Sequence, residues 1–391
     1  MSGGVNELVV DRLRVTVLSA PISDAVPMSF AQLDNRQVCL VEVSADGVTG
    51  VGESWVNYPA WGPVERVATL CEGVAPLLLG MNVSDPPAAL RILAQRLLPV
   101  ARQWGAPGPV WQAISGIDLA VWDLIGKARG APVAQLLRDG AGGTLPQPCA
   151  PAYASGVGPT DVERLCEMSL QAGLGAVKVK LGFGEERDRA TLRAARSTLG
   201  DDHLLFADAN QAWNLDTATE LCRTLAEYGV AWLEEPLDGD DLADLEKLAA
   251  ATSLTLATGE NLYGLDTFKR YSDSAAVGII QPDLAKSGGL TVASQVARHA
   301  ASSGTAVAPH CYSSALGLAA SLHFSAAFDV VDWIELDVRD NPLRTDLLTE
   351  PLRMHGASPV LPSGPGLGVQ LDPDAIARFQ THVEERTHHD R

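Results

Sequence analysis

Eight ionisable side chains recur through the second half of the chain at intervals close to one strand-plus-helix unit. In chain order they are Lys178, Lys180, Asp208, Glu234, Glu260, Asp283, His310 and Glu335. From Lys180 onward the separations are 28, 26, 26, 23, 27 and 25 residues. Each residue follows or ends a short apolar segment, so the spacing predicts that each lies at the carboxyl end of a strand in one parallel barrel, where catalytic groups gather. We therefore interpret the eight residues as one shared site.

Three of these residues are consecutive carboxylates, Asp208, Glu234 and Glu260. A set of oxygen-only ligands suits a hard cation, and Mg²⁺ prefers octahedral oxygen coordination that leaves positions for water or a substrate. Neither cysteine nor histidine lies among the three, which argues against zinc. The three carboxylates predict a Mg²⁺ site in which Mn²⁺ could substitute.

The residues on either side of the carboxylates could move protons. Lys178 and Lys180 are two positions apart on one strand, so we expect both ammonium groups to enter the site and to lower each other's pKa. This would make Lys180 a base near neutral pH. The alternative role of each lysine is to bind an anion without proton transfer, and we favour this role for Lys178. On the other side, Asp283 would fix the tautomer of His310 and raise its basicity, which makes His310 a second acid or base.

Glu335 has two interpretations. If it is protonated, it could donate a hydrogen bond to a substrate carboxylate, and if it is charged, it would contact a cationic group. A metal flanked by cationic and imidazole groups fits removal of the proton next to a substrate carboxylate, with the ene-diolate charge on the metal and Lys178. The expected partner is therefore a small-molecule carboxylate.

The elements that must position these residues begin after residue 146, where short apolar segments alternate with helix-length segments. Strict alternation predicts a parallel sheet, and eight such units in about 200 residues fit a (β/α)8 barrel. The predicted strands span residues 150–153, 176–181, 204–207, 231–233, 255–257, 277–280, 306–308 and 332–334.

The first part of the chain predicts an α+β domain. Strands are expected at 9–18, 36–43 and 48–53, and helices at 63–79, 84–103 and 108–128. Asp46-Gly47 predicts a hairpin between the second and third strands. We divide the chain into a first domain (1–140), a barrel (141–340) and a C-terminal segment (341–391) that packs back on the first domain. The polar residues 384–391 are expected to fray.

Composition and charge limit the partners. The 391 residues include 29 lysines and arginines against 48 acidic residues, a net charge of −19, so the chain repels phosphate backbones and anionic lipid. We therefore expect neither nucleic acid nor a membrane as a partner. Six cysteines without a C-x-x-C pair, and an N-terminus without a signal-peptide pattern, predict reduced thiols and a cytoplasmic location.

The joint pattern resembles the enolase superfamily, and within it the mandelate racemase group, over nearly the whole chain. The resemblance rests on a helix with the sequence Ser-Gly-Ile-Asp-Leu-Ala-Val-Trp-Asp at 115–123 and on Lys178-Val-Lys180, Asp208-Ala-Asn, Glu234-Glu-Pro, Gly-Glu260-Asn, Asp283-Leu-Ala-Lys-Ser-Gly-Gly, Pro-His310 and Glu335. It implies an N-terminal α+β capping domain and a modified (β/α)7β barrel. It also implies Mg²⁺ at the three carboxylates, Lys180 and the His310–Asp283 pair as bases, and a homo-oligomer. Muconate-lactonizing relatives carry a lysine where Asp283 stands, so this chain departs from them.

The resemblance leaves the reaction open, because one fold hosts several chemistries. Our leading hypothesis is Mg²⁺-dependent dehydration of an acid sugar to a 2-keto-3-deoxy acid. The alternatives are a racemase or epimerase of an α-hydroxy acid and a lactone cycloisomerase. A Schiff-base lysine aldolase is a different class, against which the three carboxylates argue.

Two loops of the first domain, about 21–35 and 55–62, are expected to cover the barrel mouth, since in this family such loops choose the substrate. They carry the substrate-contact candidates Met28, Phe30, Trp55, Tyr58 and Trp61. Packing between the domains is the alternative role of each aromatic ring.

Overall fold

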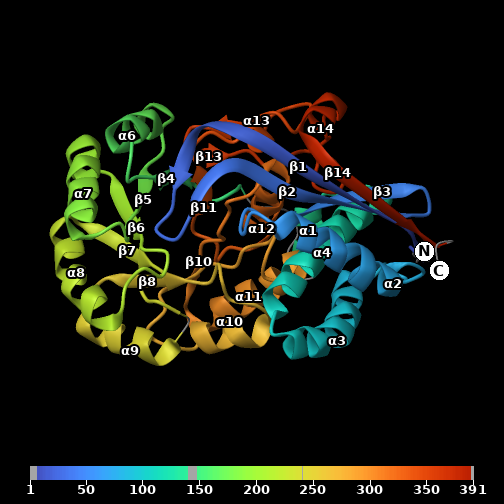
Figure 1. The fold of residues 1–391 in the computed structure, drawn as a ribbon, viewed down its shortest axis with the longest axis horizontal. Coiled ribbons are helices and arrows are strands. Elements are labelled where there is room, and N and C mark those ends of the chain that lie inside the picture. The colour runs from blue at the N-terminus through green and yellow to red at the C-terminus, as the bar shows by residue number, and fades with distance from the viewer. Residues whose placement is uncertain (1–6, 140–147, 240, 389–391) are drawn as a thin grey trace.

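Two sheets organise the chain in the computed structural model, which describes residues 7–139, 148–239 and 241–388 (Figure 1). One sheet is antiparallel, has the strand order β14-β1-β2-β3 and is called the capping sheet below. The other has eight parallel strands in the order β10-β9-β8-β7-β6-β5-β4-β11 and forms the barrel. The capping sheet crosses one end of the barrel, and its strands β1 and β14, from opposite ends of the described chain, lie side by side (Figure 1).

The capping sheet begins with three strands joined by short turns, β1 (Val10–Pro27), β2 (Gln32–Ala45) and β3 (Val48–Trp55). Ala45 pairs with Val48. Between them Asp46 and Gly47 have φ values of 51° and 74°. Two consecutive positive φ values are typical of a type I′ turn, so the predicted hairpin is confirmed.

The fourth strand of this sheet comes from the opposite end of the sequence. Strand β14 (Gln380–Thr387) pairs antiparallel with β1 between Arg12–Thr387 and Leu18–Gln380. The prediction that this segment frays is therefore wrong as far as Thr387, because the open edge of β1 offers backbone groups that β14 can pair with. Residues 389–391 lie outside the described residues.

Helical segments follow the first three strands. They are α1 (Gly62–Ala68), the π-helix η1 (Thr69–Val74), α2 (Ala75–Leu78), α3 (Pro86–Trp104), α4 (Pro107–Arg129) and α5 (Val133–Asp139). Of these, α4 packs directly on β2 and β3. Helix α4 is buried on more than its apolar face, since its polar residues Ser115, Asp118 and Asp123 are also buried. It is therefore enclosed between the capping sheet and the barrel.

Glycines allow α4 to lie directly on strand β3. A Cβ atom on Gly52 would lie 2.3 Å from the carbonyl oxygen of Gly116 and 2.6 Å from the amide nitrogen of Ala120. A Cβ atom on Gly50 would lie 2.0 Å from the carbonyl oxygen of Ala120. The two backbones therefore leave no room for a side chain.

Gly52→Ala is accordingly expected to lower the free energy of unfolding by about 1–3 kcal/mol, the usual cost of overpacking a rigid interior. Denaturant titration followed by circular dichroism would measure the loss. Gly73→Ala is the matched control, because its Cβ would meet no atom within 4 Å and should stabilise the helix slightly. Equal midpoints for the two variants would contradict the close-packing interpretation.

The barrel strands lie near their predicted positions. They are β4 (Ala152–Val157), β5 (Ala176–Lys180), β6 (Leu204–Asp208), β7 (Val230–Glu234), β8 (Thr255–Thr258), β9 (Ile279–Ile280), β10 (Ala306–Val307) and β11 (Ile334–Asp337). Two backbone hydrogen bonds, from Val307 N to Val330 O and from Asp332 N to Val307 O, join the segment before β11 to β10. The sheet thus curls into a barrel.

Seven helices connect the eight strands. They are α6 (Val162–Gln171), α7 (Glu185–Leu199), α8 (Leu215–Glu227), α9 (Leu242–Ala251), α10 (Leu265–Ser272), α11 (Gly289–Ser303) and α12 (Ala315–Ala327). In the described part of the chain, strand β11 is followed not by an eighth barrel helix but by the one-turn helix α13 (Pro342–Thr345), the hairpin of β12 (Met354–His355) and β13 (Ser358–Pro359), then α14 (Pro373–Phe379) and β14. This confirms the modified (β/α)7β barrel.

An aromatic layer fills the barrel interior below the strand ends. The rings of Phe206 and Trp232 stack with centroids 3.5 Å apart, and Tyr153 meets both rings edge-on. Phe206 and Trp232 stand two residues before Asp208 and Glu234 on their strands, and residues two apart on a strand face the same way. The layer therefore supports the carboxylates from below.

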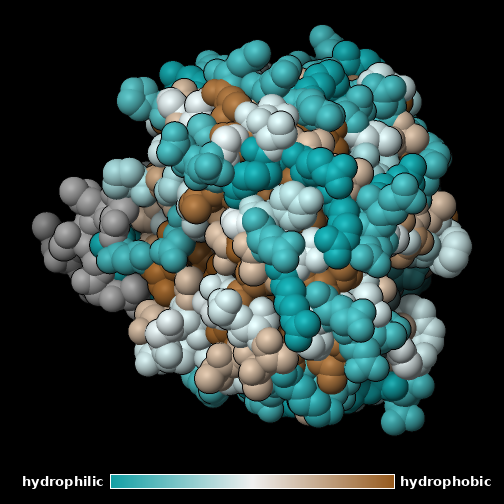
Figure 2. All heavy atoms as spheres, turned by 90° about the vertical axis from the view of Figure 1, so that its left-hand side faces the viewer, coloured by the Kyte–Doolittle hydropathy of each residue, from teal (hydrophilic) through white to brown (hydrophobic). Residues whose placement is uncertain are grey.

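The outer surface of the barrel is mostly hydrophilic on the face seen in Figure 2. Of the described helices, none combines the length and the apolar character needed to cross a membrane. All six cysteines are free thiols and buried. The predicted boundary between residues 140 and 141 lies outside the described residues, and the division into domains stays a prediction.

Candidate active site

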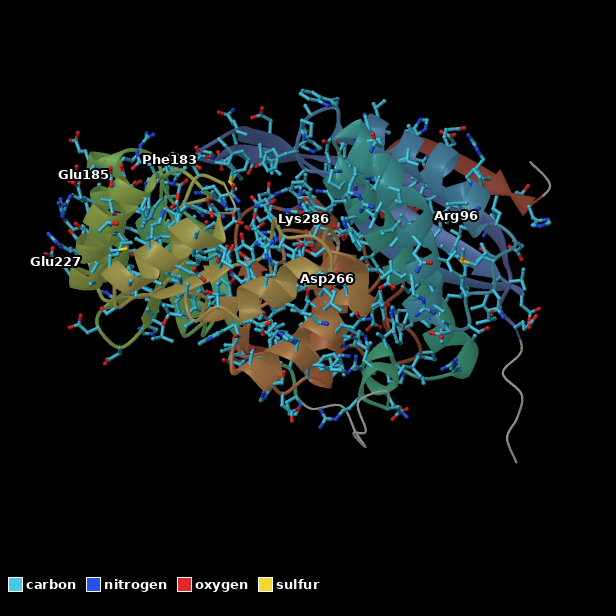
Figure 3. All side chains as sticks on the ribbon, turned by 90° about the horizontal axis from the view of Figure 1, so that it is seen from below. Arg96, Phe183, Glu185, Glu227, Asp266 and Lys286 are labelled. Atoms are coloured by element: carbon cyan, nitrogen blue, oxygen red, sulfur yellow. The ribbon has the colours of Figure 1, made fainter. Side chains whose placement is uncertain are left out.

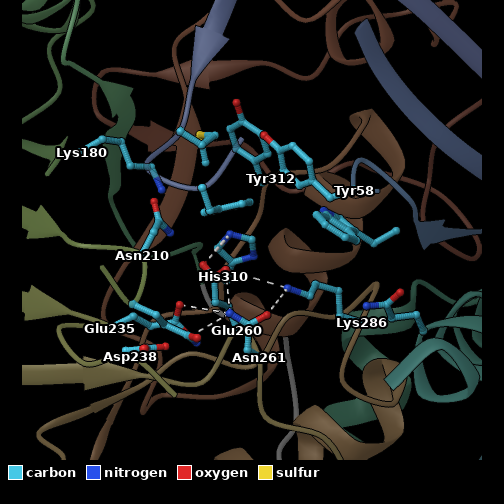
Figure 4. A pocket seen from close by; sticks show the side chains of 15 residues that line it. Tyr58, Lys180, Asn210, Glu235, Asp238, Glu260, Asn261, Lys286, His310 and Tyr312 are labelled. Carbon is cyan, nitrogen blue, oxygen red and sulfur yellow. Dashed lines mark hydrogen bonds and ion pairs between the residues drawn. The ribbon is translucent and has the colours of Figure 1, made fainter. Parts of the chain in front are cut away.

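A cavity of about 410 Å³ lies between the strand ends of the barrel and the capping sheet (Figure 4). The capping side contributes Met28, Phe30, Trp55, Tyr58 and Gln112 to its wall. The barrel side contributes mainly polar residues: Lys180, Asn210, Gln211, Glu235, Asp238, Glu260, Asn261, Lys286, His310 and Tyr312. The cavity therefore has an apolar, aromatic roof and a polar floor.

The three predicted metal ligands lie together. Asp208 ends β6, Glu234 ends β7 and Glu260 follows β8, and these are neighbouring strands of the sheet. One carboxylate oxygen of each residue lies within 4.8 Å of the corresponding oxygens of the other two. Such a cluster of hard oxygen donors has the composition that Mg²⁺ prefers.

The charges around the cluster also fit a divalent cation. Glu260 Oε2 is buried and accepts no hydrogen bond, although His310 Nε2 lies 3.0 Å away. Burial raises the pKa of Glu234 to about 8 even though Lys178 lowers it, because Asp208, Glu335 and Glu260 add further negative charge. The charged form of Glu234 is thus disfavoured in the protein by itself, although cationic groups surround the cluster, and a bound cation would relieve this.

Lys180 lines the cavity on one flank of the carboxylates, and its ammonium group donates a hydrogen bond to Asp208 Oδ2. The sequence predicts that the two lysines bring the pKa of Lys180 near neutrality. For the protein without a bound cation, this prediction is wrong. Burial and Lys178 do lower the pKa of Lys180, but Asp208, Glu260 and Glu234 outweigh them and raise it above its ordinary value. The carboxylates, which the sequence places on other strands, dominate the local field.

Lys178 does not reach the cavity, contrary to the prediction that both ammonium groups enter the site. Its Nζ donates to both oxygens of Glu234 at 2.7 Å and lies 2.9 Å from Glu335 Oε1, and its side chain has no exposed surface. Lys178 pairs with Phe206 across β5 and β6, so it belongs to the aromatic layer one level below the rim. Residues two apart on a strand share a face, but they differ in depth by about 7 Å.

Glu335 is buried for the same reason. The sequence predicts a strand that ends at residue 334, just before Glu335. In the structure, strand β11 begins at Ile334, so Glu335 is its second residue. Glu335 accepts hydrogen bonds from Ser155 Oγ at 2.5 Å and from Cys311 N at 2.9 Å. Burial raises its pKa, but Lys178 and His310 outweigh burial and lower it, so the charged form is present and contacts a cation.

His310 lies on the other flank of the carboxylates, facing the cavity. Its Nδ1 is 2.6 Å from Asp283 Oδ2, and its Nε2 points toward Glu260. Burial lowers the pKa of His310, but Glu260, Glu335 and Asp283 raise it to about 9. The structure therefore brings together the pair that the sequence suggests, with Nδ1 held by Asp283 and Nε2 facing Glu260.

Sequence reasoning missed a polar chain along the cavity floor. Lys286 Nζ donates to Asn261 Oδ1 at 3.0 Å and lies 4.7 Å from the centre of the Trp55 ring. Asn261 Nδ2 in turn donates to both carboxylate oxygens of Glu235, at 3.0 and 3.1 Å. Lys286 lies inside the molecule, whereas Glu185 and Glu227 lie at its periphery (Figure 3). The sequence holds one clue to this polar chain. Glu235 and Asn261 directly follow Glu234 and Glu260, and Lys286 is three positions after Asp283.

Four of the five predicted loop residues line the cavity: Met28, Phe30, Trp55 and Tyr58. Phe30 meets Tyr58 edge-on with centroids 5.2 Å apart. Trp61 does not line the cavity, and 71% of it is exposed. It is the N-cap residue of α1, so the chain has already turned away from the barrel mouth at this point.

Comparisons with known proteins agree with this geometry. The family described as mandelate racemase / muconate lactonizing enzyme, N-terminal domain, matches residues 12–138. The family described as enolase C-terminal domain-like matches residues 161–375.

Two relatives of known activity span nearly the whole chain. D-galactarolactone cycloisomerase of Agrobacterium fabrum is 30% identical over 387 residues, which cover 95% of this chain and 98% of that protein. L-talarate/galactarate dehydratase of Salmonella typhimurium is 31% identical over 371 residues, which cover 92% of this chain and 87% of that protein.

Solved structures give the same result. A mandelate racemase/muconate lactonizing enzyme from Bordetella bronchiseptica has a TM-score of 0.86 and 34% identity, covering 95% of this chain and 99% of that one. L-talarate dehydratase from Polaromonas sp. JS666, solved with Mg and L-glucarate, has a TM-score of 0.82 and 25% identity, covering 97% and 99%.

Proposed function

The chain belongs to the mandelate racemase and muconate lactonizing enzyme family of the enolase superfamily, and from this membership we propose that it removes the proton next to the carboxylate of an acid sugar. The observation that carries the proposal is the order of residues around the cavity. Lys180 and His310 line it on opposite flanks of a buried carboxylate triad. A substrate held over the triad would thus meet one proton-transfer group from each side.

We propose that Asp208, Glu234 and Glu260 hold Mg²⁺, as their oxygen donors and the buried Glu260 Oε2 without a hydrogen bond support. When bound, the ion would offset the charge that develops on the substrate carboxylate and would compete with Lys180 for Asp208. Lys180 would take the α-proton. Asp283 would keep His310 oriented, and Nε2 of His310, on the cavity side, would donate a proton to a departing β-hydroxyl group. The product would be a 2-keto-3-deoxy acid.

The cavity wall supports a hydroxylated substrate. Asn210, Gln211, Asp238 and Asn261 offer donors and acceptors on the barrel side, while Trp55 and Tyr58 offer ring faces on the capping side. The relatives named above act on galactarate, talarate or a galactarolactone, which are sugar acids or their lactone. Both observations favour an acid sugar over an apolar carboxylate.

A lactone cycloisomerase is the second candidate, because a relative with that activity matches 95% of the chain. The two reactions share proton removal next to a carboxyl carbon and differ in the bond that breaks after it. A racemase or epimerase remains the third.

A panel of acid sugars, their lactones and α-hydroxy acids, assayed with Mg²⁺, would separate the three reactions. Dehydration is expected to give a 2-keto product that semicarbazide detects. Conversion of a lactone to an open-chain isomer of the same mass, without loss of water, would identify a cycloisomerase, and solvent deuterium at an inverted α-carbon would identify a racemase. Absence of α-proton exchange with the whole panel would contradict the proposed chemistry.

Two further parts of the proposal concern setting and assembly. We propose a cytoplasmic, homo-oligomeric enzyme, and the free, buried state of all six cysteines supports a reducing compartment. Size-exclusion chromatography with light scattering would measure the oligomeric state.

A further inference from the structure

A buried carboxylate on the capping sheet is bound entirely by the barrel segment that carries His310. Glu53, on strand β3, is only 1% exposed. Its Oε1 accepts a hydrogen bond from Ser314 N at 3.0 Å, and its Oε2 accepts from Gly317 N at 3.0 Å and from the Ser314 hydroxyl. These donors lie at the start of helix α12, four to seven residues after His310.

Helix α12 does not need Glu53 as a cap. Ser314 is its N-cap residue and already accepts a hydrogen bond from Leu316 N at 3.1 Å. A carboxylate buried without a cationic partner is costly, and here neutral donors at a helix N-terminus compensate it. The residue therefore fixes the position of the segment and is not required to form the helix.

The segment from His310 to Ser314 is held from both sides. From the capping side, Asn57 Nδ2 donates to Tyr312 O at 3.1 Å. From the barrel side, Cys311 N donates to Glu335 Oε2 at 2.9 Å. All residues of α12 are buried, so a change at its first turn is expected to stay confined to that turn and to the residues before it.

The same strand also contacts the segment that carries Asp283. Trp55 N, two residues after Glu53, donates to Ala285 O at 3.3 Å. Ala285 N donates to Asp283 Oδ1 at 2.7 Å. The end of β3 thus lies between the two loops that bear the His310–Asp283 pair, and it continues into the roof of the cavity at Trp55.

We propose that Glu53 is a positioning residue that sets the orientation of the His310 imidazole by holding residues 310–317 against the capping sheet. The inference rests on the proposed role of His310 in proton transfer. It makes the alignment of His310 a property of the capping sheet as well as of the barrel. Because a displacement of about 1 Å at a reacting group can cost about 10²-fold in rate, a small movement of this segment is enough to matter.

The test is Glu53→Gln, which keeps the size of the side chain and an acceptor for Ser314 N. Its amide group would face the donor Gly317 N, so the first turn of α12 should move. We expect kcat to fall about 10- to 100-fold while KM changes less than threefold. Asp123→Asn is the matched control, since Asp123 is also 1% exposed and accepts from Val51 N and Leu367 N, away from His310. It should lower stability but keep kcat within twofold.

A second readout needs no substrate, so it separates this inference from the proposed function. Acylation of His310 by diethyl pyrocarbonate, mapped by mass spectrometry, is expected to be at least fivefold faster in Glu53→Gln and unchanged in Asp123→Asn. If Glu53→Gln does not fold, Ser314→Ala takes its place, with an expected threefold increase. An acylation rate equal to that of the unmodified sequence overturns the proposal, whatever the activity of the variant. Failure to turn over any acid sugar, with faster acylation, refutes only the proposed function.

Discussion

His310→Asn is expected to lower kcat for dehydration by about 10³-fold, within the range that general acid–base catalysis contributes. The asparagine side chain is smaller, but its amide nitrogen can still donate one hydrogen bond to Asp283, which is 2.6 Å from His310 Nδ1 in the structure. It cannot carry a proton to a leaving hydroxyl group. The fold should persist, so the melting temperature should change little.

The variant also separates the two proposed proton-transfer groups. If Lys180 takes the α-proton, exchange of that proton with D₂O should continue in His310→Asn while the keto product is lost. Proton NMR of the substrate measures the exchange. His299→Asn is the control, because His299 pairs with Asp273 on the surface, outside the cavity. Full dehydratase activity in His310→Asn would show that the site assignment is wrong.

Removal of the metal is expected to have an effect of similar size. A divalent ion contributes several kcal/mol to stabilising developing charge, which corresponds to a loss of about 10³-fold or more in kcat/KM. Treatment with EDTA should abolish activity, and added Mg²⁺ should restore it. An enzyme that works at full rate after chelation would contradict the proposed reaction.

Glu234→Gln tests the same site at one residue. It removes a charged ligand from the centre of the triad. Loss of a residue that merely contacts a metal ligand costs about 10- to 100-fold in affinity, so loss of a ligand should cost more. Calorimetry with Mg²⁺ and without substrate measures the affinity. Glu227→Gln, on the exposed end of α8, should bind Mg²⁺ as the parent does. Equal affinity in Glu234→Gln would remove Glu234 from the ligand set.

The rim of the barrel could be predicted because its spacing is set by the fold. A parallel strand and its helix occupy about 25 residues, and every strand ends at the same face, so the period of Asp208, Glu234, Glu260, Asp283 and His310 indicates their shared position. This periodicity can be recognised in the sequence alone, and an error of a few residues in a predicted strand end does not obscure it.

Depth within the barrel could not be predicted in the same way. Lys178 and Glu335 differ from true rim residues by one or two positions along their strands, which moves them from the cavity into the aromatic layer. Sequence patterns rarely fix strand ends to that precision. The ends become certain only when the register with neighbouring strands is known.

Contacts between segments that are far apart in the sequence could not be predicted either. Glu53 meets Ser314 across 261 residues, and Lys286 meets Asn261 across 25. No sequence pattern near either residue of a pair indicates its partner. A carboxylate near a strand end, such as Glu53, looks like an ordinary surface charge until the position of the partner helix is known. The pKa of Lys180 depends in the same way on carboxylates that only the fold brings near.

The pairing of β14 with β1 has a consequence for how the protein is made. Strand β1 is 18 residues long and emerges from the ribosome early, but the strand that covers its outer edge begins at Gln380. Throughout synthesis that edge can pair with another nascent chain, which is a known route to aggregation. A proteolytic cut before Gln380 would expose the edge again in the finished molecule. The outer edge of β1 is thus covered by a strand that is made long after it.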